Sequence, residues 1–327
     1  MVYGCNVLSV ECLRQILRHD YFGTIPRVVL WSWLVFKQHR LLARVRRALD
    51  YPGYRASKPL RKPRQLRSHT FFIIGSGDSV NDLSPKHFAV MNHQTSVGLN
   101  IWVAHDYVPD LYSFEGGGFP ASDQEIHHRR FLSSRLLAHS ISAKKPAVLQ
   151  LVPKAPHDGS QLVTLPPDVR SRSALVGRVN LLKSRSFEGL RRDLGIILRL
   201  MQMKIVPPDV FPDSGASALR MIFYGFQQGF QEIVLVGVDL NTTSYFWYAK
   251  GREREFAELR RLFPRVTSDT HDTLLTENRP YSAREFILTL ADVLRSKFGV
   301  NVWAGSSRSS LASKIGVFNW VGDGGAD

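Results

Sequence analysis

Two apolar runs, far apart in the sequence, each end in a glycine turn. Residues 70–74 lead into the Gly-Ser-Gly sequence of residues 75–77, and residues 230–236 lead into Gly-Val-Asp at 237–239. Continuous apolar runs of this kind are typical of buried strands in a parallel sheet. Ligands of such sheets collect outside the carboxyl ends of the strands, so we expect the two turns to face one crevice.

The first turn has the composition of a phosphate-binding turn. Gly75 and Gly77 permit a positive φ and the close approach of backbone amides to a ligand, and the hydroxyl of Ser79 follows. The third glycine of the dinucleotide fingerprint is absent, so a tight strand-to-loop turn without a ligand is the alternative. The turn indicates a nucleotide site, and the second glycine turn strengthens that interpretation.

Strand-like and helix-like segments alternate along the rest of the chain. This alternation predicts an α/β fold with a doubly wound, mainly parallel, Rossmann-like sheet and an N-terminal helical appendage. We expect strands at 70–74, 87–91, 146–151, 232–238 and about 300–303, and helices at 189–203, 216–228 and 282–298, the last capped by Ser282.

The net charge of +15 is concentrated near the beginning of the chain. Between residues 37 and 67, eleven Lys and Arg residues accompany a single acid, Asp50. Residues 28–36, directly before them, are largely apolar and contain Trp31 and Trp33, but are far shorter than the roughly 20 residues that cross a bilayer. This pattern fits a helix lying on an anionic membrane surface.

Two alternatives for the basic segment stay open. The apolar residues 28–36 can instead pack as a core helix while the arginines form a solvated face. A nucleic-acid-binding arm is the third interpretation, but the aromatic residues precede the charges instead of alternating with them as a stacking surface requires. Nucleic acid is therefore not an expected partner.

We divide the 327 residues into residues 1–66, a basic amphipathic appendage and linker, and residues 67–327, a transferase domain. An insert at 116–165 is a candidate acceptor lid. The only cysteines, Cys5 and Cys12, provide no disulfide framework and no zinc-binding spacing, so a reducing cytoplasm is the expected setting. Whether the chain forms a homo-oligomer is left open.

Tyrosine and histidine side chains follow the second glycine turn. Tyr245 and Tyr248 lie three residues apart, and His271 stands next to Asp272. Tyrosine donates to phosphate oxygens without adding charge, and a histidine beside a carboxylate is a common general base near neutral pH. The alternatives are a packed tyrosine pair and a loop-capping His-Asp pair. The order of these parts favours transfer from a phosphorylated donor.

This order of motifs resembles the bacterial sialyltransferases of glycosyltransferase family forty-two, which add sialic acid to lipooligosaccharide from CMP-sialic acid. The resemblance covers about residues 69–315 and implies a GT-A-like variant of the sheet. It matches the family's glycine turn to residues 74–80, its strand-end asparagine to Asn92, its Thr-Ser-Gly turn to residues 213–215, and its closing Asn-Ser-Leu to residues 309–311.

The resemblance implies a donor site and a catalytic set. His271 is the implied base, and Tyr245 and Tyr248 are implied to bond to the departing phosphate. The implied donor-binding residues are Gly75, Ser76, Gly77, Ser79, Asn92, Ser214, Gly215, Asp239 and Asn241.

The chain also departs from the family pattern. Asp78 stands where the family has proline, and an acid there disfavours a nearby phosphate unless it faces the nucleoside. The family arginine before the Thr-Ser-Gly turn falls on Phe211, and its threonine falls on Asp213. The first family tyrosine aligns more directly with Asn241 than with Tyr245. The donor sugar is therefore sialic acid or a related CMP-activated sugar.

The implied reaction is inverting transfer to a glycan or lipid-linked glycan. The leaving group is a monophosphate, whose charge neutral donors and helix N-terminal amides can meet, so neither a metal nor another cofactor is expected. The sequence has no Asp-x-Asp metal motif. A lipid-linked acceptor would place the protein in the cytoplasm, peripherally on the inner face of the membrane.

Two rival functions remain. One is a Mg²⁺-dependent pyrophosphokinase-like enzyme that uses ATP on a similar fold. The other is a degenerate, non-enzymatic nucleotide fold that binds a membrane or nucleic acid through its basic N-terminal region.

Overall fold

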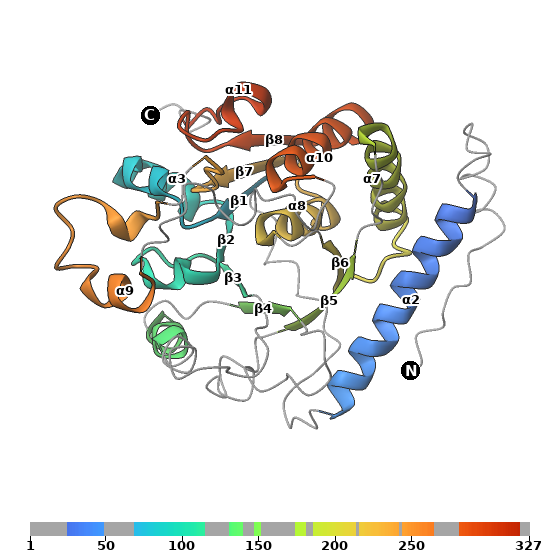
Figure 1. The fold of residues 1–327 in the computed structure, drawn as a ribbon, viewed down its shortest axis with the longest axis horizontal. Coiled ribbons are helices and arrows are strands. Elements are labelled where there is room, and N and C mark those ends of the chain that lie inside the picture. Colours follow the sequence, from blue (N-terminus) through green and yellow to red (C-terminus); the bar gives the residue numbers. More distant parts are fainter. Residues whose placement is uncertain are drawn as a thin grey trace.

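The chain folds around one parallel β-sheet (Figure 1). The structure is a computed structural model that describes residues 25–48, 69–114, 131–139, 147–151, 174–180, 186–213, 216–241, 244–264 and 281–320. Its sheet has eight strands in the order β6-β5-β4-β3-β2-β1-β7-β8, and every neighbouring pair is parallel. The α/β fold with a doubly wound parallel sheet is confirmed.

The strands and the main helices alternate as the sequence predicts. The strands are β1 Thr70–Ile74, β2 Thr95–Leu99, β3 Leu111–Phe114, β4 Ala147–Leu151, β5 Ala174–Asn180, β6 Val210–Asp213, β7 Glu232–Val236 and β8 Asn301–Ala304. The α-helices are α2 Ile25–Ala48, α3 Pro85–Asn92, α7 Phe187–Gln202, α8 Ser217–Gln228, α9 Ala257–Leu262, α10 Ala283–Phe298 and α11 Ala312–Ile315, and short 3-10 helices span η1 Asp78–Asp82, η2 Asn100–Ala104 and η4 Phe246–Tyr248.

The strand order reverses between β1 and β7. From β1 the sheet extends through β2 to β6 in chain order on one side, whereas β7 and β8 lie on the other side. Such a reversal is the place where open parallel sheets usually bind ligands, outside the carboxyl ends of the strands. The two glycine turns of the sequence follow these two strands directly.

Three amphipathic helices cover one face of the sheet. Helix α8 packs on β1, β2, β6 and β7, and α7 contacts both α8 and α10 (Figure 1). Helix α10 begins where the sequence predicts, because the Ser282 hydroxyl accepts a hydrogen bond of 3.2 Å from the Glu285 amide. The helices expected at 189–203 and 216–228 correspond to α7 and α8.

The strand expected at residues 87–91 is wrong. These residues lie in α3, which begins after Ser84, where Pro85 suits the first helical position and His87 Nδ1 accepts a 2.8 Å hydrogen bond from the Ser84 amide. The strand follows later, as β2, and Asn92 is the last helical residue. Strands β2, β3, β5 and β6 were not expected, whereas β1, β4, β7 and β8 were.

Helix α2 belongs to the folded body on one of its faces. The side chains of Val28, Trp31 and Val35 are buried in the same hydrophobic core as the sheet, and α2 contacts β5, β6 and α7. The core-helix interpretation therefore holds for this face. None of the helices in the described ranges is long and apolar enough to cross a bilayer.

The division at residues 66 and 67 stays a prediction, since residues 51–68 lie outside the described part of the chain. Most of the expected lid at 116–165 also lies outside it; the described pieces are the helical residues 131–139 and β4. The lid stays a prediction.

Candidate functional site

The two glycine turns pack directly against each other at the reversal of the sheet. The Gly75 amide donates to the Val236 carbonyl at 2.7 Å, and the Gly77 amide donates to the Gly237 carbonyl at 2.8 Å. A Cβ atom on Gly75 would lie 2.6 Å from the Gly237 oxygen. Gly237 itself has a φ of +62°. The glycines are thus required by contact between the turns, independently of any ligand.

Asp239 fastens the second turn to the first. Its buried carboxylate accepts a 3.0 Å hydrogen bond from the Ser79 amide and a second bond from the Ser79 hydroxyl. Both carboxylate oxygens of Asp239 therefore bond to Ser79, in the segment that follows β1. Asp239 and Ser79 thus hold the two glycine turns together, and their assignment to the donor site stays a prediction.

Asp78 is paired with an arginine from a distant loop. Arg308, which follows β8, makes hydrogen bonds of 3.0 and 3.1 Å to the Asp82 carboxylate and another to Asp78. These bonds raise the pKa of the Arg308 guanidinium above its usual value, and the bond to Asp78 contributes most. The ion pair offsets the negative charge that the sequence places beside the first glycine turn.

Asn241 is also fixed by this loop. Its side-chain amide donates to the Arg308 carbonyl at 2.9 Å, and the Ser310 amide donates to the Asp239 carbonyl at 2.9 Å. The loop after β8 thus closes over the end of β7. Asn241 lies at the strand ends as expected, but its side chain is exposed and serves this loop contact.

A polar cluster at the end of β2 was missed by sequence reasoning. Asn100 follows β2 with a φ of +48°, and its side-chain amide donates to the Ser217 hydroxyl at 3.2 Å. The buried Arg220 donates to the same hydroxyl oxygen at 3.0 Å. These side chains bring together the end of β2 and the first turn of α8. An asparagine after an apolar Val-Gly-Leu run is the signal that could have identified this position.

Asn92, the asparagine expected at a strand end, is exposed at the end of α3 instead. The structural position that was predicted for Asn92 is occupied by Asn100. Ser214 and Gly215, which the sequence assigns to the donor site, lie outside the described residues, directly before α8. Phe211 is fully buried in the core, so it takes no part in the strand-end cluster.

The two tyrosines have different surroundings. Tyr245 forms an isolated antiparallel bridge with Gly77, and its ring stacks on Trp247 with 4.5 Å between centroids. The next amide, of Phe246, donates to the Ser76 carbonyl at 3.0 Å. Tyr245 therefore lies beside the first glycine turn.

Tyr248 instead donates its hydroxyl hydrogen to the Phe263 carbonyl. A phosphate would have to replace this bond before Tyr248 could donate to it, because a tyrosine carries a single donor hydrogen. The position of Tyr245 beside the first glycine turn favours it as the tyrosine at the site.

His271, the expected base, lies outside the described residues. Burial lowers the pKa of two described histidines, His105 and His139, to about 4. His105 Nδ1 accepts a 3.0 Å hydrogen bond from the Tyr107 amide, and His139 Nδ1 lies 2.6 Å from the Tyr112 hydroxyl. Both rings are neutral at pH 7 and engaged with neighbouring groups, so neither replaces His271 as the candidate base.

No cluster of three or more His, Cys, Asp or Glu side chains that could hold a metal ion occurs within the described ranges. Metal independence stays a prediction that activity measurements must test.

No protein-family model matches this chain, and no curated protein gives a significant match. Solved structures of Campylobacter jejuni sialyltransferases are similar to it. The α-2,3-sialyltransferase Cst-I has 16% identity and a TM-score of 0.43, covering 79% of this chain and 83% of that chain. CstII in complex with the substrate analogue CMP-3FNeuAc has 16% identity and a TM-score of 0.45, covering 79% and 89%. At these values the fold assignment rests on the chain's own sheet topology.

Proposed function

We propose that the chain is an inverting, metal-independent glycosyltransferase that moves sialic acid or a related sugar from a CMP-activated donor to a glycan or lipid-linked glycan. One observation carries the proposal. The glycine turns, Asn100, Ser217 and Tyr245 lie at the carboxyl ends of parallel strands and at the start of α8, around the reversal of the strand order. The resemblance seen in the sequence supports the proposal, because it matches a glycine turn, a strand-end asparagine and a Ser-Gly turn to the sialyltransferase family, although it assigned the asparagine to Asn92.

The donor end of the proposed site is suited to an anion. The first turn of α8 presents backbone amides and the positive end of the helix dipole, next to the Asn100 amide. Arg308 pairs with the carboxylates of Asp78 and Asp82 and offsets one of their two negative charges. A phosphate or a sugar carboxylate bound at the start of α8 would meet these hydrogen-bond donors, and Arg308 would reduce its repulsion by Asp78 and Asp82.

In the proposed reaction, the acceptor hydroxyl oxygen attacks the anomeric carbon as the bond from that carbon to the phosphate oxygen breaks. His271 takes the hydroxyl proton, and the departing CMP keeps the bonding electron pair. Tyr245 donates to the phosphate as its charge increases, which lowers the barrier without a cation. We also propose a cytoplasmic location on the inner face of the membrane.

Calorimetry of ligand binding tests this function. CMP, UDP and ATP are titrated into the full chain, first in EDTA and then with Mg²⁺. We expect selective CMP binding in EDTA. Mg²⁺-dependent ATP binding would instead indicate a pyrophosphokinase-like enzyme, and no nucleotide binding would indicate a non-enzymatic fold.

A matched pair of asparagine variants locates the site. Asn100→Ala removes a side chain at the strand end, so we expect CMP affinity to fall about tenfold. Asn92→Ala alters an exposed side chain at the end of α3 and should leave the affinity unchanged. Equal effects of the two variants would contradict the proposed site, and CMP-sugar turnover in EDTA would establish the reaction.

A further inference from the structure

Large apolar side chains are exposed together on one face of α2. Six such side chains are exposed in the described part of the chain, and three of them, Val29, Trp33 and Phe36, belong to this helix, with exposed fractions of 56%, 53% and 46%. Spacings of four and three residues place them on one helical face. We call Val29, Trp33 and Phe36 the outer stripe.

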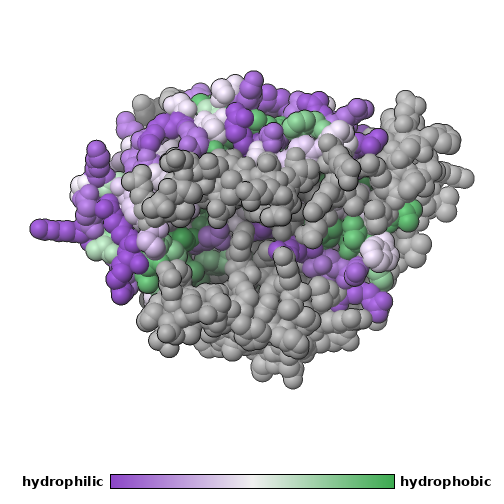
Figure 2. Space-filling model, viewed as in Figure 1, coloured by the Kyte–Doolittle hydropathy of each residue, from purple (hydrophilic) through white to green (hydrophobic). Residues whose placement is uncertain are grey.

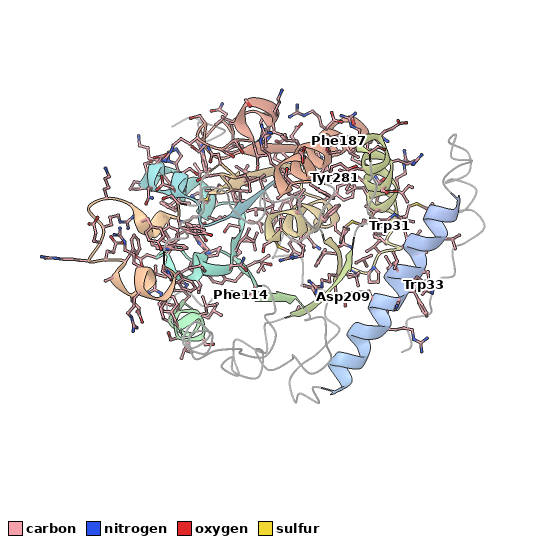
Figure 3. All side chains as sticks on the ribbon, viewed as in Figure 1. Trp31, Trp33, Phe114, Phe187, Asp209 and Tyr281 are labelled. Carbon is pink, nitrogen blue, oxygen red and sulfur yellow. The ribbon has the colours of Figure 1, made fainter. Side chains whose placement is uncertain are left out.

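The other face of α2 fixes the direction of the outer stripe. Trp31 is fully buried, with Val28 and Val35, against the body of the protein. In Figure 3, Trp31 lies on the side of α2 toward α7, and Trp33 on the opposite side. Figure 2 shows hydrophobic surface in the region where Figure 1 places α2. The packed face therefore holds the outer stripe away from the core.

Cations border the outer stripe. Lys37 Nζ lies 5.1 Å from the centre of the Trp33 ring, and the Arg40 guanidinium carbon lies 5.7 Å from the centre of the Phe36 ring. These contacts place positive charge against the faces of the two rings. The 24 residues of α2 include no Asp or Glu. The surface is thus apolar in its centre and positively charged at its border.

We propose that the outer stripe docks on the surface of an anionic phospholipid bilayer, with Trp33 and Phe36 at the headgroup–acyl boundary and Lys37 and Arg40 among the lipid phosphates. At a bilayer interface, aromatic rings insert at the boundary between headgroups and acyl chains, and the charged ends of long basic side chains stay among the headgroups. A second copy of the chain fits less well, because a symmetric contact between two α2 helices would bring together two basic surfaces with no acid on either helix to balance Lys37 and Arg40. The inference rests on the membrane location proposed above, and not on the transferase activity.

Because one face of α2 is part of the core, the docking is tested by substitutions and not by a truncation. Deleting residues 1–66 would remove Trp31, Val28 and Val35 from the core, so loss of binding by that truncation would not separate docking from folding. Substitutions on the outer stripe avoid this problem because those side chains are exposed.

Co-sedimentation of the full chain with vesicles is the test. Vesicles of equal parts phosphatidylglycerol and phosphatidylcholine are compared with phosphatidylcholine alone. We expect the unmodified chain to bind the anionic vesicles, and W33S/F36S to bind them about tenfold less tightly. The charge reversal K37E/R40E should also weaken binding, most at low salt. The matched control is Phe187→Ser on α7, whose side chain is exposed to a similar extent, 49%, and which should bind normally.

Several outcomes would overturn the proposal: no binding by the unmodified chain, equal binding to both kinds of vesicle, or equal losses in W33S/F36S and Phe187→Ser. A change of sedimentation coefficient in W33S/F36S without vesicles would show that a second copy covers the outer stripe instead. Circular dichroism establishes that W33S/F36S is folded. Vesicle binding without CMP binding would refute the transferase and leave the docking surface intact.

Discussion

Asp239 and Ser79, which are 160 positions apart, form a two-point contact that joins the ends of β7 and β1. One carboxylate accepts from both the amide and the hydroxyl of the same serine. The pair is buried, so neither group can exchange its partner for water easily. The contact fixes the two glycine turns relative to each other at the reversal of the sheet.

Removing the hydroxyl from this contact should destabilise the fold. Ser79→Ala leaves one Asp239 oxygen without its hydroxyl partner in a buried place, and we expect the free energy of unfolding to fall by about 1–3 kcal/mol. Urea denaturation measures this change. Ser296→Ala is the matched control, because that exposed hydroxyl only donates to the Asp292 carbonyl of its own helix. If both substitutions are neutral, the Asp239–Ser79 contact is not structural.

A methyl group on Gly77 should be more damaging than the loss of a hydrogen bond. Its Cβ would lie 2.5 Å from an Asp239 carboxylate oxygen and 2.7 Å from the Gly237 carbonyl oxygen, so the turns must separate. We expect Gly77→Ala to lower the free energy of unfolding by about 3 kcal/mol or more.

Gly195 on α7 provides the comparison for Gly77. A Cβ there would meet only the end of the flexible Lys297 side chain, at 3.3 Å. Since alanine is the better helix former, we expect Gly195→Ala to be neutral or to stabilise the protein by up to about 1 kcal/mol. Thermal and urea denaturation of both variants check the contrast; equal effects would show that the turns are not tightly packed.

The charge of Arg308 should affect anion binding more than stability. Arg308→Gln leaves the carboxylates of Asp78 and Asp82 uncompensated beside the first glycine turn. We expect CMP affinity to fall about fivefold at low salt, and less at high salt. Arg191→Gln, which removes the exposed pair with Asp292, is the control and should bind CMP normally. A salt-independent loss would point to a structural cause.

Substitution of Tyr245 should affect turnover, whereas substitution of Tyr248 should affect stability. On the proposed mechanism, Tyr245→Phe removes a phosphate donor, and we expect kcat to fall about a hundredfold with little change in folding. Tyr248→Phe removes the bond to Phe263, and we expect a loss of about 1 kcal/mol in the free energy of unfolding with kcat within about threefold. Steady-state kinetics and urea denaturation of both variants test this, and the reverse pattern would exchange the two assignments.

His105 should make the fold sensitive to mild acid. Burial lowers its pKa from 6.5 to about 4, so between these pH values the unfolded chain binds a proton that the folded chain does not. The free energy of unfolding therefore falls as the pH decreases through this window, by about 2 kcal/mol from this residue between pH 7 and pH 5.

A non-titrating substitution isolates the effect of His105. Asn at position 105 can still accept a hydrogen bond from the Tyr107 amide but binds no proton in this range. We expect His105→Asn to make the decrease in stability between pH 7 and pH 5 smaller by about 2 kcal/mol, leaving the part that His139 contributes. An unchanged slope would mean that His105 is protonated in the folded protein.

The parts of the fold that could be predicted are those with a strong local signal. β1 and β7 are continuous apolar runs, and α10 has its cap at Ser282 and an apolar face. β2 was missed because its Thr-Ser-Val-Gly-Leu sequence is only weakly apolar, and its burial depends on strands and helices from elsewhere in the chain. The apolar residues of α3 were mistaken for that strand.

Of the candidate site, only the two glycine turns could be predicted from the sequence. The glycine turns follow recognisable strands, so their meeting at one edge could be expected. The pairing of Arg308 with Asp78 joins residues 230 positions apart, and no local pattern indicates such a contact. Arg220 and Ser217 likewise become a cluster with Asn100 only because α8 packs beside β2.

The loop after β8 has a consequence for how the chain is made. Strand β1 emerges from the ribosome early, but its turn is complete only after β7 has paired with it and Arg308 has reached Asp78. A nascent chain that ends before β7 has β1 and its glycine turn without this neighbouring strand. If the proposed function holds, affinity for a nucleotide therefore arises late in synthesis, after β7 and the loop that follows β8 have joined the first glycine turn.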